Sequence, residues 1–111
     1  DALKFLKREK RRASLYDAIL LDPPTFGRGA QGEVFKIEEE IVPLLTLCRE
    51  LLTEHPRLLL FSCHTPGFTP TTLTHLLHQV FPRGDIRAKE LLLHTPGALP
   101  IPSGAYAIWT P

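Results

Sequence analysis

The residues with the clearest chemical potential follow directly after the apolar run 18–21. Asp22 is expected at the carboxyl end of a strand, where its carboxylate could bind an amine, orient a base or cap a following helix. Pro23 and Pro24 fix the backbone and remove two N–H donors, so nearby carbonyl oxygens are free to accept hydrogen bonds. Phe26 adds an aromatic ring that can stack on a planar group. Together they favour a site for a nucleobase or another planar, amine-bearing molecule.

A second pair of reactive side chains follows the apolar run 58–61. Cys63 is expected where this strand leaves the sheet, and a free thiol beside polar groups can act as a nucleophile once deprotonated. The alternative is a small buried apolar residue, which most free cysteines are. His64 is adjacent, but neighbouring strand residues point to opposite faces. Position alone therefore does not make His64 the base that activates the thiol.

Three glycines at positions 27, 29 and 32 form a loose Gly-x-Gly-x-x-Gly string. The dinucleotide-binding motif needs its first glycine at the strand end and its helix starting inside the motif. Here two prolines intervene, so we interpret 22–35 as a mobile flap near the site. His75 and His78 have a helical spacing that could bind a metal, yet no acid or cysteine lies at ligand spacing nearby. We therefore predict no metal.

The alternation of helices and strands that must position these residues is typical of the α/β class. The spacing predicts helices over 2–13, 37–52 and 70–80, and strands over 16–22, 57–62, 86–94 and 105–110. The uninterrupted apolar run predicts that the first strand is buried on both faces of a mainly parallel sheet. The last two strands lack an intervening helix, which favours antiparallel pairing. Ligands bind beyond the carboxyl ends of parallel strands, so 22–29 and 62–68 should meet at one edge.

Three local features qualify this assignment of helices. Pro43 lies inside the second helical pattern and should kink the helix or mark a restart. Thr69 and Pro70 fit the N-cap and first position of the third helix. Cys48 falls on the apolar face of the second helix, which predicts a core residue.

Length and composition bound the rest of the interpretation. The 111 residues form one domain at most, and 43% hydrophobic and 23% charged residues exclude a disordered tail. Two cysteines, no signal peptide and no long apolar span predict a cytoplasmic protein with no membrane segment. The chain opens on Asp1 inside a helical pattern, which suggests the C-terminal part of a longer protein.

Basic residues crowd the beginning of the chain although its net charge is only +1. The cluster is Lys4, Lys7, Arg8, Lys10, Arg11 and Arg12. Such a cluster could contact phosphates. The favoured interpretation is a solvated helix face with a basic C-terminal end that the helix dipole stabilises.

The segment 16–29 resembles the fourth motif of class I S-adenosylmethionine-dependent methyltransferases. The specific likeness is to the branch that contains the bacterial large-subunit rRNA cytosine-5 methyltransferases. Segments 32–36, 47–49 and 60–63 also resemble that branch, and the likeness covers essentially the whole chain. It implies that 1–111 is the C-terminal portion of a single methyltransferase domain. The fold would be the second half of a Rossmann-like sheet, with parallel strands and a final antiparallel hairpin.

The resemblance also implies a cofactor and the residues that hold it. The cofactor would be S-adenosylmethionine, with the missing upstream strands supplying much of its site, so the isolated fragment should bind it poorly and be inactive. Asp1 and Ala2 match the segment in which an acid meets the adenine amino group. Asp22 and Pro23 would also contact the cofactor.

The acceptor that the resemblance implies is cytosine C5 in RNA, specifically rRNA. Cys63 would add to C6 of the ring as the nucleophile, and Asp22 would hold the N3/N4 edge as the second catalytic residue. Substrate contacts would come from Pro23, Pro24, Phe26 and His64. Two alternatives remain open. One is methylation of an exocyclic or small-molecule amine, and the other is a non-enzymatic half-domain that binds RNA or a partner through its basic helix.

Overall fold

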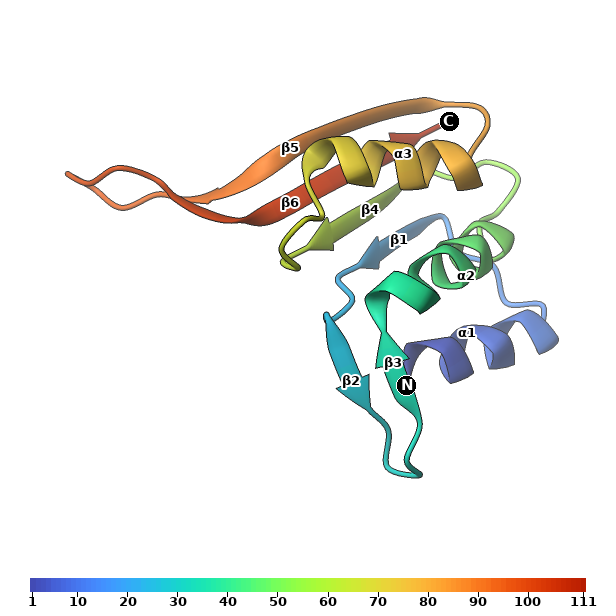
Figure 1. Ribbon diagram of the computed structural model, residues 1–111. Coiled ribbons are helices and arrows are strands. Elements are labelled where there is room, and N and C mark those ends of the chain that lie inside the picture. Colours follow the sequence, from blue (N-terminus) through green and yellow to red (C-terminus); the bar gives the residue numbers. More distant parts are fainter.

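The computed structural model describes residues 1–111 as a four-stranded mixed sheet, a separate two-stranded hairpin and three helices (Figure 1). The elements are α1 (Ala2–Arg11), β1 (Ala18–Leu21), β2 (Phe26–Arg28), β3 (Val34–Lys36), α2 (Ile37–Glu50), β4 (Leu58–Cys63), α3 (Pro70–Val80), β5 (Asp85–Leu93) and β6 (Ile101–Thr110). The larger sheet has the order β1-β4-β6-β5. The α/β class that the alternating pattern predicts is confirmed.

The sheet contains both parallel and antiparallel pairs. β1 pairs in parallel with β4, whereas β6 pairs antiparallel with β4 and with β5. The predicted antiparallel pairing of the last two strands is therefore confirmed. The strands β1, β4 and β5 all run in one direction, as expected, but β6 lies antiparallel between β4 and β5, so β1–β4 is the one parallel pair.

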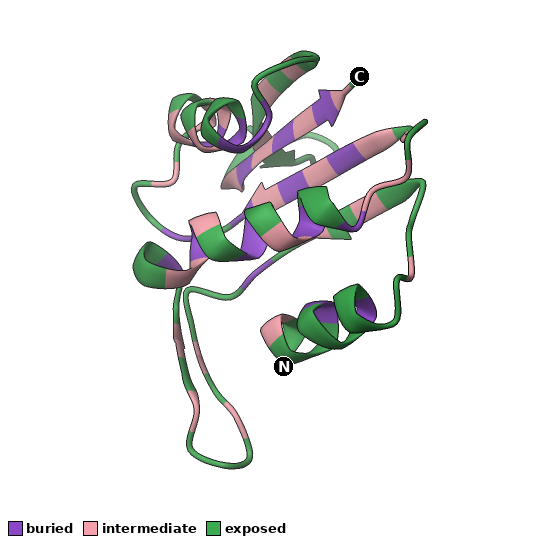
Figure 2. Ribbon diagram, turned by 90° about the vertical axis from the view of Figure 1, so that its right-hand side faces the viewer, coloured by how far each residue is buried: buried purple, intermediate pink, exposed green.

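Alternate residues of the central strands β4 and β6 face the core. Leu59, Phe61 and Cys63 are fully buried in β4, and the residues between them are only partly buried. Their register partners in β6, which include Ala107 and Trp109, are also buried. Figure 2 shows this alternation along the strands. These side chains form one cluster with the buried residues of α1, α2 and α3, so the helices pack on this face of the sheet.

The prediction that β1 is buried on both faces of the sheet is wrong. It forms one edge of the sheet, and Leu20 is 74% exposed. Ile19 and Leu21 pack against the core, so Leu20 points to the sheet face opposite the helices. The apolar run 18–21 is therefore buried only on the face of the sheet that the helices cover.

The helices begin and end largely where their residues predict. Asp1 caps α1 by accepting a hydrogen bond from the Lys4 N–H at 3.2 Å, and Thr69 caps α3 through the Thr72 N–H at 3.2 Å. Helix α2 continues through Pro43 as one element. Pro43 is exposed, so water can solvate the carbonyl group that the missing N–H leaves unpaired. None of the three helices combines the length and apolar character that crossing a membrane requires.

The segment predicted as a flap, 22–35, is in part an ordered hairpin. Phe26 pairs with Lys36 and Arg28 pairs with Val34 in an antiparallel ladder. The Gly29 N–H donates to the Glu33 carbonyl oxygen at 2.8 Å and closes the turn. Aromatic and β-branched residues on both sides of a glycine-containing turn are a hairpin signal, and here they prevail over a loop.

A hydrogen bond between the segment that follows α1 and α1 itself should make the stability of the fold depend on pH. The Tyr16 hydroxyl donates to Glu9 Oε2 at 2.7 Å. This bond, with smaller contributions from Ser14, Arg12 and Arg8, lowers the pKa of Glu9 against the opposing effect of desolvation. A lowered carboxyl pKa stabilises the fold above the pKa of the unfolded chain, and this stabilisation is lost as pH falls through the folded pKa.

Tyr16→Phe should therefore lower the melting temperature at neutral pH, and the deficit should shrink as Glu9 becomes protonated in acid. The measurement is the melting temperature of both proteins from neutral pH down to about pH 3. Tyr106→Phe is the control, because no hydrogen bond of the Tyr106 hydroxyl is found in the structure. A deficit of equal size at every pH would show that the Glu9 contact does not carry the effect.

Candidate functional site

Asp22 lies immediately beyond the carboxyl end of β1 and contacts the end of β4. The parallel register pairs Leu20 with Leu60, which brings Asp22 beside Ser62 on the same face of the sheet. Asp22 Oδ1 accepts a hydrogen bond from Ser62 Oγ at 2.8 Å, and His64 Nε2 lies 3.5 Å from the same oxygen. The Asp22 side chain is 60% exposed, so Oδ2 can receive a ligand. Helix capping does not explain Asp22, since α2 is preceded by Lys36.

A second polar contact joins the segments that follow β1 and β4. The Thr25 and Thr65 hydroxyls are 2.7 Å apart, and Thr65 is buried. The predicted meeting of 22–29 and 62–68 at one edge of the sheet is therefore confirmed. The two strand ends form a rim at which Asp22, Ser62 and His64 share one exposed surface.

A cavity of about 480 Å³ opens beside this rim, between the start of α1, the end of β1 and the β2–β3 hairpin. Its volume lies within the usual range of small-molecule and cofactor sites. Its wall is formed by Asp1, Ala2, Leu3, Lys4, Lys7, Leu21, Asp22, Pro23, Pro24, Gly27, Arg28, Gly29, Glu33, Val34, Phe35, Glu40 and Leu44. The structure thus gathers Asp1, Ala2, Asp22 and Pro23, the four predicted cofactor contacts, around one cavity.

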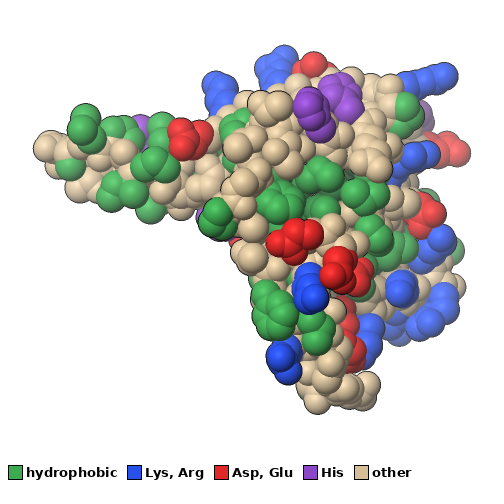
Figure 3. Space-filling model, in the orientation of Figure 1, with side chains coloured by type: hydrophobic (Ala, Val, Ile, Leu, Met, Phe, Trp, Pro, Cys, Tyr) green, Lys and Arg blue, Asp and Glu red, His purple; other side chains and the backbone are tan.

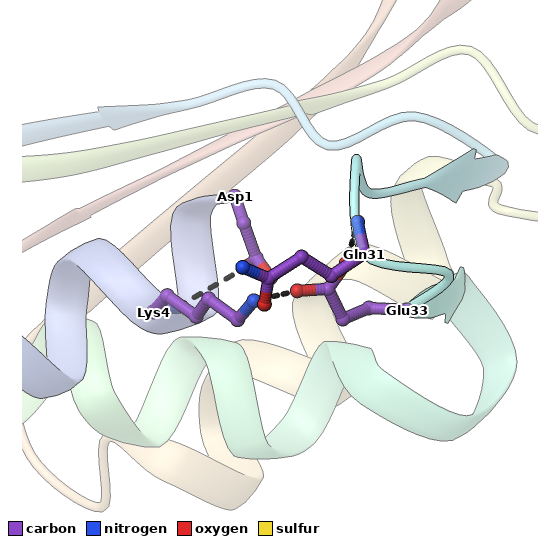
Figure 4. Close-up of polar contacts among 4 residues, drawn as sticks. All are labelled: Asp1, Lys4, Gln31 and Glu33. Atoms are coloured by element: carbon purple, nitrogen blue, oxygen red, sulfur yellow. Dashed lines mark hydrogen bonds and ion pairs between the residues drawn. The ribbon is translucent and has the colours of Figure 1, made fainter.

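The hairpin closes onto α1 through charged side chains that the sequence interpretation missed (Figure 4). Lys4 forms an ion pair with Glu33, and the Gln31 N–H donates to Glu33 Oε2 at 3.1 Å. Glu33 lies in the segment 32–36, to which the resemblance assigns no ligand contact, and Lys4 belongs to the basic cluster at the start of the chain. The contact joins residues of two elements far apart in sequence, so their pairing depends on the folded position of the hairpin.

The predicted substrate residues are only partly brought together. Pro23 and Pro24 line the cavity and His64 contacts Asp22, but Phe26 does not line the cavity. Its ring is 50% exposed on β2, with the Arg28 guanidinium carbon 5.8 Å from the ring centroid. Phe26 is therefore exposed on the hairpin and is not part of the cavity wall.

Cys63 does not expose its thiol at the rim, where the sequence interpretation expects a nucleophile. It is the last residue of β4, opposite Ala105 of β6, and it is fully buried. Strand alternation directs Cys63 toward the helix-covered face and Ser62 toward the face that carries Asp22. The Cys63 thiol thus points into the core, whereas the Asp22 carboxylate contacts Ser62 at the exposed rim. Cys48 is also buried, as predicted, and desolvation raises the pKa of its thiol to about 11.

Comparison with known proteins yields matches among solved structures. No family model and no curated protein matches the chain. A SAM-dependent methyltransferase from Agrobacterium tumefaciens matches with a TM-score of 0.92 and 30% identity, over 100% of this chain and 38% of that protein. A protein from Streptococcus mutans described as a SAM-dependent methyltransferase matches with a TM-score of 0.69 and 20% identity, over 99% of this chain and 29% of that protein. A complex of M1.HpyAVI with SAM matches with a TM-score of 0.55 and 14% identity, over 98% of this chain and 51% of that protein.

These matches define the fold that surrounds the site. The chain spans 38% of the length of the Agrobacterium tumefaciens protein, and the two more distant structures show the fold alone. The neighbours are SAM-dependent methyltransferases, and complexes with SAH and with SAM are among them. The mixed sheet of this chain therefore has the fold of these methyltransferase neighbours.

Proposed function

We propose that the protein is an S-adenosylmethionine-dependent methyltransferase whose acceptor is the amine of a planar base in RNA, held by Asp22. The observation that carries the proposal is the position of the Asp22 carboxylate. It is held by Ser62 at 2.8 Å and adjoins His64 at 3.5 Å, at a strand end that borders a ligand-sized cavity. The 30% identity over the whole chain to a SAM-dependent methyltransferase supports the reaction class.

The cavity fits the chemistry of S-adenosylmethionine. Leu21 and Leu44 give the cavity apolar walls suited to an adenine ring. Asp1 Oδ1 accepts a hydrogen bond from the Lys4 N–H, so the second carboxylate oxygen is free to accept a hydrogen bond from an exocyclic amino group. Acidic side chains at Asp22 and Glu40 suit the positive charge of the cofactor. When bound, the cofactor supplies an electrophilic methyl group on its sulfonium.

Asp22 would act on the acceptor through the carboxylate oxygen that Ser62 does not occupy. Oδ2 can accept a hydrogen bond from the amine, and the carbonyl groups beside Pro23 and Pro24 can accept a second. These two acceptors would orient the nitrogen lone pair toward the cavity. After methyl transfer the nitrogen carries an extra proton, which Oδ2 can take and release to solvent. Ser62 would keep the carboxylate in position throughout.

The position of Cys63 favours nitrogen over carbon as the acceptor atom. Cytosine-5 transfer, which the family resemblance implies, needs a thiolate that adds to C6 of the ring. Cys63 is fully buried in the core, so a ring held by the exposed Asp22 carboxylate could not contact its sulfur in this arrangement. An exocyclic amine needs only the Asp22 side of the rim.

The proposal predicts that Cys63→Ala of the full-length protein keeps its turnover within about threefold of the wild type. The measurement is transfer of labelled methyl from S-adenosylmethionine to RNA, followed by mass spectrometry of the modified nucleoside. Cys48→Ala, a second buried thiol that lies on α2, is the matched control for lost packing. Loss of all transfer in Cys63→Ala alone, with both variants folded by melting curves, would instead establish carbon methylation.

A further inference from the structure

We infer that the exposed face of α1 formed by Lys4, Phe5, Lys7, Arg8 and Arg11, hereafter the α1 face, binds single-stranded RNA. These side chains, with Asp1, line a continuous surface hollow. Figure 3 shows lysine and arginine side chains gathered over α1. A row of cations beside an exposed aromatic ring is the combination with which proteins follow a single-stranded backbone and stack its bases.

Charge accounting shows that part of this basic cluster lacks a protein partner. Glu9 is buried and accepts a hydrogen bond from the Tyr16 hydroxyl. Its carboxylate also lies near Arg8 and Arg12. Lys10 forms an ion pair with Glu50 at 2.8 Å. Lys7 and Arg11 form no ion pair in the structure. They stand four residues apart and so share one side of the helix. Two free cations in one row are suited to two phosphates of an RNA strand.

The aromatic element of the α1 face is Phe5. Its ring is 44% exposed, although it belongs to a helix with an apolar side available for the core. The Arg8 guanidinium carbon lies 5.2 Å from the ring centroid. Such a ring and a planar cation at its face can both stack on a base. Phe5 also lines an apolar hollow together with Leu6 and Ile19, so its ring lies between this hollow and the basic row.

The α1 face is continuous with the candidate site. Asp1, Lys4 and Lys7 line both the surface hollow and the cavity that Asp22 borders. An RNA strand on α1 could therefore deliver a base to the rim. In taking RNA as the partner the inference rests on the proposed function, but RNA binding can be measured without cofactor or transfer.

The test is fluorescence anisotropy of the full-length protein with a labelled single-stranded RNA of about ten nucleotides, as a function of salt. Lys7→Glu/Arg11→Glu should weaken binding at least tenfold and reduce the salt slope by about 1.4, the value for two phosphate contacts. Arg83→Glu/Lys89→Glu is the matched control, because it makes the same charge change at exposed positions near and on β5. Equal losses in both double variants would overturn the inference.

A second variant separates base stacking from other uses of an apolar side chain. Phe5→Leu should weaken RNA binding roughly tenfold because leucine cannot stack on a base. Unchanged RNA affinity in Phe5→Leu, or binding to anionic phosphatidylserine vesicles without binding to RNA, would overturn the inference. If these variants bind RNA normally while Asp22→Asn loses transfer, the proposed function stands and the α1 face is excluded. The reverse pattern would exclude the role of Asp22 and keep the α1 face.

Discussion

Asp22→Asn in the full-length protein should lower kcat/KM for methyl transfer by about two to three orders of magnitude. Asparagine keeps the size of the side chain, and its amide oxygen can still accept a hydrogen bond from the Ser62 hydroxyl. It loses the negative charge that stabilises the acceptor nitrogen as this atom becomes positive, and it cannot take the proton. Most of the effect should therefore fall on kcat, because the missing interaction is strongest in the transition state.

The matched control is Asp85→Asn. Asp85 is an exposed carboxylate that lies 3.0 Å from Arg87 at the start of β5, near the amino end of β4 and so away from the rim. Its replacement should leave transfer within about twofold of the wild type. S-adenosylmethionine affinity, measured by calorimetry, shows whether the Asp22 variant still loads the cofactor. Full turnover by a folded Asp22→Asn protein would remove Asp22 from the chemistry and end the proposed acceptor site.

The position of Asp22 could be predicted because it needs only local information. An apolar run marks a strand, and the residue that ends the run lies at the sheet edge where α/β proteins bind ligands. The same reasoning placed the end of β4 beside it, and the hydrogen bond between Asp22 and Ser62 confirms the contact. Alternation of strands and helices therefore sufficed to locate the rim.

The orientation of Cys63 could not be predicted, because it depends on which face of the sheet the helices cover. Alternation alone states that Ser62 and Cys63 point to opposite faces. It does not state which of them faces the core, since β4 is apolar at both sets of positions before Ser62. The choice is fixed by packing of α2 and α3 against Leu59 and Phe61, which is a property of the folded chain.

The hairpin and the cavity that it closes depended on long-range contacts for the same reason. Each strand of the hairpin has only three residues, so the aromatic and β-branched residues beside its turn form no period that would distinguish strands from a loop. The ion pair between Lys4 and Glu33 joins α1 to this hairpin and has no signature in either segment. Sequence identified residues that could bind a ligand, and folding decided which of them share a cavity.

Gly104→Ala should lower the free energy of unfolding by about 3 kcal/mol, through an unfavourable backbone angle and a steric clash. Gly104 has a φ of 91°, in the left-handed region that favours glycine. A Cβ atom there would overlap the Cys63 carbonyl oxygen and come within 3.0 Å of His64 Cα. Both are backbone atoms, so the strain can be relieved only by moving β6 away from the end of β4.

Gly97→Ala separates the two causes, because Gly97 also has a positive φ, 75°, but a Cβ there would have no atom within 4 Å. It should cost only about 1 kcal/mol. The measurement is denaturant unfolding of both variants, together with methyl transfer. Since the clash at Gly104 displaces His64, which adjoins Asp22, its transfer should fall beyond the loss of folded protein, while Gly97→Ala should keep the wild-type rate. Equal free energies of unfolding in the two variants would show that close contact between β6 and the end of β4 does not position the rim. In that case the positions of Ser62 and His64 would depend on their own strand alone.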